Sequence, residues 1–181
     1  MNNKIMNTKQ VSNDVFYIDD PFVNINCNQI EKLKNLVGNS SLKRNRLCVH
    51  RTIEDKIHEM FIVLLKDTYI MPAKHIGKIE SLLVLEGCAD AVFFNEEGKI
   101  SNVVPLGEYS SGLQFYYRMD DPIYHTLIIK TKYFIFKEVT QGPLNKRDTI
   151  IASWAPQESN KTDAAEYMEK LKHEVATMLT I

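Results

Sequence analysis

The sequence predicts an all-β fold in which short strands form an antiparallel sandwich or barrel. From Arg46 to Val139, short apolar runs alternate with turn residues, and little of the intervening sequence could form a helix. The runs are FIVLL, SLLVL, AVFF, ISNVV, LQFYY, HTLII and YFIFKEV. The breaks include IGK, EGC, NEEGK and GEYSSG. Many short strands at this spacing are typical of sandwiches and barrels.

Length and composition are those of a globular protein with one domain and extensions. The chain has 181 residues, of which 44% are apolar and 25% are charged. Its net charge of -1 gives no electrostatic reason to expect nucleic acid or a membrane surface as a partner. The three cysteines include no CxxC pair, which favours a reducing compartment. Since no apolar signal segment or bilayer-length run is visible either, we expect a cytoplasmic protein.

Two helical segments flank the strands. Residues 1–43 form the predicted N-terminal extension, with a strand over VFYI (15–18) followed by a helix capped by Asn28, with Glu31 at the capping-box position. The barrel is predicted over residues 44–156. Residues 157–181 are predicted to form a C-terminal helix, with Asp163 and Glu166 at capping-box spacing.

An apolar seam runs along the predicted C-terminal helix. It consists of Ala164, Met168, Leu171, Val175 and Met178. The seam can pack against its own domain, or it can pair with its twin in a homodimer.

The stretch YIMPAKHIGKIESLLVLEG (69–87) carries the most informative chemistry. If Tyr69 to His75 is one strand and Glu80 to Leu85 is the next, His75 and Glu80 lie opposite each other with Cβ atoms about 5 Å apart. Such a pair could be a plain ion pair, or it could share a divalent ion. A third ligand could come from His125, at the start of a later strand that returns beside these two.

The segment AKHIGKIESLLVLEG resembles the first cupin motif, in which four residues separate a histidine from a glutamate and six more precede a glycine. His125 falls where the second cupin motif has its histidine. The chain is similar in particular to the WbuC-like cupins of bacterial surface-polysaccharide gene clusters. The shared features are an arginine-rich strand ending in histidine (44–50), a YxxP sequence (69–72) and a closing GP…WAP segment (142–156).

The resemblance implies a cupin double-stranded β-helix, a jelly-roll barrel, over residues 44–156. It also implies a metal site, although the family's first histidine falls on Ala73. The remaining ligand set is His75, Glu80 and His125, which can hold a divalent transition metal such as Zn, Fe, Ni or Mn. Loss of the fourth ligand could instead mean that this chain no longer uses a metal.

Several other residues are candidates for the same pocket. His50 could line it, could replace the ligand missing at Ala73, and could act with His125 as acid and base. We expect Arg46, Tyr69 and Lys78 to bind substrate, the arginine through a phosphate or carboxylate group. A solvated face is the alternative for the arginine. His58 and His173 are expected at the surface.

The resemblance implies a metal-binding cupin that acts on a sugar or nucleotide-linked sugar in surface-polysaccharide synthesis. Isomerase or epimerase chemistry, in which a proton is moved, fits this class best. A non-catalytic module that binds a carbohydrate or a metal is one alternative. An Fe(II)-dependent dioxygenase is another. The sequence has no nucleophile elbow, phosphate loop or Rossmann fingerprint.

Overall fold

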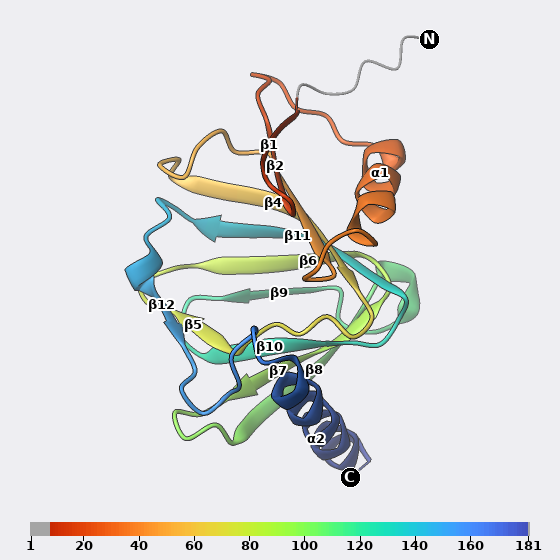
Figure 1. The fold of residues 1–181 in the computed structure, drawn as a ribbon, viewed down its shortest axis with the longest axis vertical. Helices are drawn as coiled ribbons and strands as arrows, with labels where there is room; N and C mark the ends of the chain where they lie inside the picture. Colours follow the sequence, from red (N-terminus) through yellow and green to blue (C-terminus); the bar gives the residue numbers. More distant parts are fainter. Residues whose placement is uncertain (1–7, 181) are drawn as a thin grey trace.

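The computed structural model describes residues 8–180, which form two β-sheets and two α-helices (Figure 1). One sheet has seven strands, in the order β1 (Thr8–Ser12), β2 (Val15–Ile18), β3 (Arg44–Cys48), β4 (Ile57–Leu65), β11 (Tyr133–Gln141), β6 (Glu80–Glu86) and β9 (Tyr116–Met119). The other has five, in the order β12 (Thr149–Ile151), β5 (Ala73–His75), β10 (Tyr124–Ile129), β7 (Cys88–Phe94) and β8 (Ile100–Gly107). Residues 1–7 of the predicted N-terminal extension lie outside the described residues.

The strands from β4 to β11 pair as the two arms of one long hairpin, and this hairpin folds over so that its strand pairs are divided between the two sheets. The antiparallel pairs are nested, β4 with β11, β5 with β10, β6 with β9 and β7 with β8. Alternate pairs fall in opposite sheets, and β11–β6 and β10–β7 contacts complete each sheet. This is the double-sheet jelly roll, the architecture that cupins use. The predicted fold class is therefore confirmed.

The inner face of the seven-stranded sheet changes from apolar at one end to polar at the other. Inward positions on adjacent strands align in three rows, namely Ile62–Phe136–Val84, Met60–Glu138–Leu82 and His58–Thr140–Glu80. Side chains alternate along a strand, so successive rows are two residues apart. The apolar end contributes to the buried core between the sheets. The polar end is consequently where a site can form.

The N-cap of each helix is an asparagine that comes earlier in the chain than the predicted cap. Helix α1 (Cys27–Val37) is capped by Asn26, whose side chain accepts from the Asn28 amide, and Gln29 completes the capping box. Helix α2 (Lys161–Leu179) is capped by Asn160. The predicted caps at Asn28 and Asp163 are wrong, because both residues already lie within the first turn of their helix.

The seam of α2 packs on its own domain. Ala164, Met168, Leu171 and Val175 are buried, and the last three form one cluster with side chains of the five-stranded sheet, against which α2 lies (Figure 1). Met178 is 44% exposed, so the buried seam ends at Val175 and does not include the last predicted residue. These four residues are not free to pair with a twin helix. Within residues 8–180, no helix has the length and apolar character needed to cross a membrane.

Gly87 allows the chain to cross from β6 in one sheet to β7 in the other. Its φ is +85°, and a Cβ atom there would overlap the carbonyl oxygen of Tyr133. We expect Gly87→Ala to lower the free energy of unfolding by about 3 kcal/mol, since strain adds to a backbone clash. Urea unfolding measures the loss.

Gly77→Ala is the matched control for Gly87→Ala. Its φ is +64°, but a Cβ atom would meet nothing within 4 Å. Only conformational strain remains, and we expect a loss of about 1 kcal/mol. Equal losses in the two variants would contradict a close-packed crossover at Gly87.

Candidate metal centre

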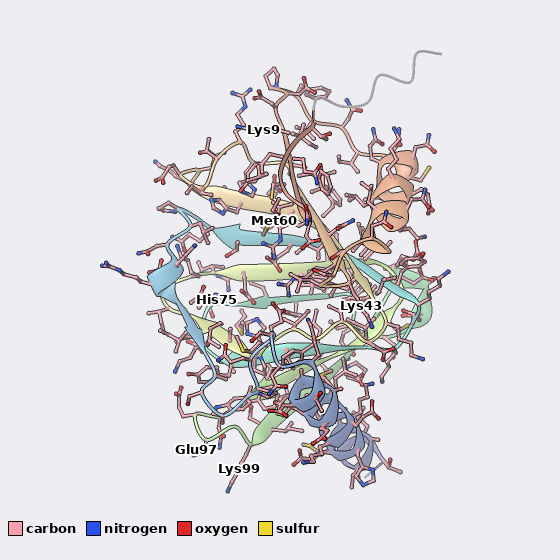
Figure 2. The ribbon with its side chains drawn as sticks, in the orientation of Figure 1. Lys9, Lys43, Met60, His75, Glu97 and Lys99 are labelled. Carbon is pink, nitrogen blue, oxygen red and sulfur yellow. The ribbon has the colours of Figure 1, made fainter. Side chains whose placement is uncertain are left out.

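The polar end of the jelly roll encloses a cavity of about 360 Å³ between the two sheets. Its polar lining includes Arg46, His50, His58, His75, Lys78, Glu80, Tyr117, His125, Glu138, Thr140 and Thr149. Gln141, Leu144 and Asn145 also contribute to the wall. His75 lies among the side chains between the sheets (Figure 2). The cavity therefore lies between the sheets and offers several polar side chains that could bind a ligand.

His75, Glu80 and His125 come together in this cavity from three different strands. One ligand atom of each lies within 4.8 Å of the others. The Nε2 atom of His125 is 3.1 Å from Oε1 of Glu80, and Nε2 of His75 is 3.7 Å from Oε2. Ligand atoms around a tetrahedral ion with bonds of about 2.0–2.1 Å are about 3.3 Å apart. Small side-chain adjustments would therefore suffice to hold an ion.

The predicted pairing of the strand that ends at His75 with the strand that begins at Glu80 is wrong, although the two side chains do meet. His75 belongs to the five-stranded sheet, where it pairs with Thr149. Glu80 belongs to the seven-stranded sheet, where it pairs with Thr140 and Met119. Residues 76–79 cross between the sheets instead of turning back. The two side chains thus face each other across the interior.

The outer nitrogen of each imidazole is held so that the inner one faces Glu80. Nδ1 of His125 lies 2.9 Å from the carbonyl oxygen of Ile123, which can only accept, so Nδ1 carries a hydrogen. Nδ1 of His75 lies 3.1 Å from the hydroxyl of Thr149. Metal-ligating histidines are commonly oriented in this way by a partner of the second nitrogen. The donor set and its orientation fit a transition metal.

The three groups shift one another's pKa in the metal-free site. Burial alone would lower the pKa of His125, but the hydrogen bond and charge of Glu80 outweigh it and raise the pKa. Burial would raise the pKa of Glu80, but His125 lowers it. Burial lowers the pKa of His75, and Glu80 opposes this only in part. Without a metal, these pKa shifts favour an ion pair between His125 and Glu80 and the neutral form of His75.

This ion pair predicts a pH dependence of folding for chelator-treated protein. Folding raises the pKa of His125, so its contribution is complete below the unfolded value of about 6.5 and is lost as pH rises through the folded value. We expect the difference in unfolding free energy between wild type and His125→Gln to shrink from pH 6 to pH 9. Urea titrations measure it. A His125 difference that grows from pH 6 to pH 9 would contradict the assignment.

Ala73 lies where the fourth ligand of the resemblance would be. It pairs directly with His125 across β5 and β10, and it precedes His75 by two residues on the same strand. It also lines the cavity. A methyl group cannot ligate, so this side of the site stays open.

The structure brings most of the other predicted residues to the cavity. Arg46, His50 and Lys78 all line it. Lys78 lies at the mouth, where its Nζ donates to the carbonyl oxygen of Pro143 and pairs with Asp148 at 3.1 Å. His50, however, is outside the group of three that could share an ion, so it does not replace the ligand missing at Ala73.

Tyr69 is not brought to this cavity. It precedes β5, which begins only at Ala73, and so it does not share that strand's alternation. Its hydroxyl donates to the carbonyl oxygen of Pro156 at 2.8 Å, and its ring packs edge-on against Tyr167 of α2. It lines a separate cavity beside α2 instead.

Sequence reasoning missed two residues of the central cavity. His58 was predicted at the surface but is only 4% exposed. It shares the inner face of β4 with Met60, Ile62 and Leu64, which follow it at every second residue. Glu138 is two residues from Phe136 on the same face of β11, and it lines the cavity. Burial raises the pKa of Glu138, the charge of Glu80 adds to this, and Arg46 opposes it. Strand alternation was the signal for both.

Comparisons with known proteins give a partial match to one family model and a likeness of fold. The family described as "Domain of unknown function (DUF6016)" matches residues 25–106, which is less than half of the chain. No curated protein matches the sequence.

Solved structures resemble the jelly roll at low sequence identity. A protein from Shewanella oneidensis is 7% identical with a TM-score of 0.49, over 59% of this chain and 72% of that one. The Cnp3 cupin domain of Schizosaccharomyces pombe is 10% identical with a TM-score of 0.43, over 55% and 64%. A sugar phosphate isomerase from a cupin superfamily of Silicibacter pomeroyi is 16% identical with a TM-score of 0.38, over 49% and 52%. At these scores the likenesses carry no argument of their own, and the assignment of this chain to the jelly-roll fold rests on its nested strand pairing.

Proposed function

We propose that this jelly roll binds a divalent transition metal ion through His75, Glu80 and His125 and holds a sugar-type ligand beside it. The observation that carries the proposal is the convergence of two oriented imidazoles and one carboxylate within 4.8 Å. Two imidazoles and one carboxylate suit Zn, Fe, Ni or Mn, with positions left for water or a ligand. The cavity of about 360 Å³ is in the range of small-molecule sites.

The reaction we propose is proton transfer on a sugar or nucleotide-linked sugar, of the isomerase or epimerase type, in surface-polysaccharide synthesis. The resemblance of the first motif to WbuC-like cupins supports this finer part. When bound, the metal would act as a Lewis acid. The residues proposed to act as acid and base are His50 and His125, and both line the cavity.

Elemental analysis of protein purified without chelators tests the metal site. We expect close to one equivalent of a transition metal, before or after reconstitution. Less than a tenth of an equivalent after reconstitution would defeat the proposal. The identity of the metal also tests the dioxygenase alternative, because that chemistry requires a redox-active iron and a zinc protein would exclude it.

Isotope exchange separates an enzyme from a binding module. The open position at Ala73 favours a non-catalytic module as the second candidate. Metal-loaded protein is incubated with a panel of nucleotide-linked keto-sugars in deuterated water. Deuterium at a sugar carbon supports the isomerase or epimerase, whereas tight binding without exchange supports the module.

A further inference from the structure

His50 and His58 form a stacked pair in the same cavity, away from the three candidate ligands. Their ring centroids are 4.1 Å apart and the ring planes differ by 2°. They are 6% and 4% exposed, and both line the cavity. His58 and Glu80 each pair with Thr140, so the two residues are separated by two strand spacings, about 10 Å. The stacked pair thus lies at the end of the row His58–Thr140–Glu80 that is farther from the candidate metal ligands.

The Nε2 nitrogens of both rings lack partners, and that of His58 lies beside Gly142, where a Cβ atom would come within 2.7 Å of it. Nε2 of His50 and Nε2 of His58 are buried and have no hydrogen bond to any described residue. Buried polar atoms are rarely left in this state, because each lost hydrogen bond is costly. A ligand atom or an ordered water is therefore the expected partner of each.

Hydrogen bonding around His50 identifies its Nε2 as a donor. The Glu59 amide, which can only donate, lies 3.2 Å from Nδ1 of His50. The Glu59 carbonyl oxygen lies 3.1 Å from the same nitrogen but already accepts from Val49. Nδ1 is thus the acceptor, and burial lowers the pKa of the ring, so the single proton of neutral His50 is on Nε2. A donor in this position requires an acceptor from the ligand.

The stacked pair is poorly arranged for a second metal ion. Imidazole lone pairs lie in the ring plane, and planes only 2° apart direct them in parallel rather than toward one point. The one group of three or more candidate metal ligands among residues 8–180 contains neither histidine. An oxygen group of a ligand is the better partner.

Arg46 adds a positive charge to this wall, which acts on the buried Glu138 without a direct contact. It lies on the same face of the chain as His50 and lines the cavity, and its guanidinium has no ion pair or hydrogen bond with the described residues. By contrast, Arg44 is held by Glu158 through contacts of 2.7 and 3.3 Å. The nearby carboxylate of Asp55 is already bound by the Arg51 amide and the Thr52 hydroxyl. Arg46 is thus free to bind a charged group of the ligand.

We propose that Arg46, His50 and His58 form a subsite for an oxyanion, a carboxylate or phosphate group, carried by the ligand whose other end lies at His75, Glu80 and His125. The second half of this statement rests on the proposed function. Oxyanion binding itself needs no metal. A sugar acid and a sugar phosphate share the required chemistry, since both join polar hydroxyls to an anionic group about one sugar ring away.

Nitrogen-15 spectra of histidine side chains test the subsite in chelator-treated full chain. The probes are inorganic phosphate, acetate and neutral D-glucose. We expect free His50 to show the Nε2–H tautomer, and one or both anions to shift the His50 and His58 signals saturably. Arg46→Gln should weaken this binding about tenfold, whereas Arg44→Gln, two residues away but already paired, should leave it unchanged.

The same samples show which proposal fails. Absence of saturable shifts with both anions, or equal shifts with D-glucose, would overturn the oxyanion subsite and leave water or neutral hydroxyls as the partners. Equal weakening by Arg46→Gln and Arg44→Gln would also overturn it. Titration with zinc alone then reports on His75, Glu80 and His125 independently. Both arginine variants avoid the risk that replacing a buried histidine prevents folding, which thermal unfolding confirms.

Discussion

Glu80→Gln is expected to lower metal affinity about 100-fold or more, so that dialysed protein keeps almost none. Glu80 supplies the carboxylate of the three-residue group, and its two oxygens lie 3.1 and 3.7 Å from the two imidazoles. Glutamine keeps the size of the side chain and one acceptor oxygen but removes the charge and replaces the second acceptor with a donor. Two neutral imidazoles and an amide form a poor site for a divalent ion. Equilibrium dialysis with zinc, read by elemental analysis, measures the loss.

Glu138→Gln is the matched control for Glu80→Gln. Glu138 lines the same cavity from the neighbouring strand, and its charge acts on His125, but it is not one of the three candidate ligands. We expect its replacement to change metal affinity by less than about tenfold, the size of a purely electrostatic effect. If both variants lose metal equally, the carboxylates act through charge alone and Glu80 is not a ligand. If both retain it, the ion binds elsewhere.

Local sequence patterns predicted the kind of fold but not its pairing. Apolar runs and turn residues are local signals, and they indicated an antiparallel sandwich or barrel, which the resemblance to cupins narrowed to a jelly roll. The pairing of β4 with β11 joins Leu65 to Tyr133, far along the chain, and no local pattern specifies it. Helix starts were missed for a related reason. Several polar residues near each start can serve as caps, and the backbone conformation at Asn26 and Asn160 decides among them.

The candidate site was predicted in its residues but not in its geometry. Motif spacing selected His75, Glu80 and His125, and the structure brings them together. The predicted pairing of the two strands was wrong because sequence spacing does not tell whether residues 76–79 turn back or cross between sheets. Alternation along β4 would have placed His58 inside. The prediction for Tyr69 was wrong because the strand was expected to begin at Tyr69, whereas β5 begins only at Ala73.

Ala73→His is expected to tighten metal binding about 10- to 100-fold by adding a fourth ligand. Residue 73 lies directly across from His125, where Cβ atoms are about 5 Å apart, and it shares the inward face of β5 with His75. An imidazole there reaches the same ion without a change of backbone. Competition with a chromogenic chelator measures the gain. Ala73→Leu fills a similar space without a ligand atom, so an equal effect of the two variants would contradict the geometry.

The effect of Ala73→His on binding of the sugar-type ligand distinguishes two explanations for the alanine at position 73. If position 73 is open so that a sugar-type ligand can reach the ion, Ala73→His should gain metal affinity and lose ligand binding together. The panel of nucleotide-linked sugars measures the second quantity in the same metal-loaded protein. Tighter metal binding with unchanged ligand binding would mean that the open side has no such role. The oxyanion subsite around Arg46 and His50 lies on a different part of the wall, so phosphate binding to that subsite should be unchanged in either case.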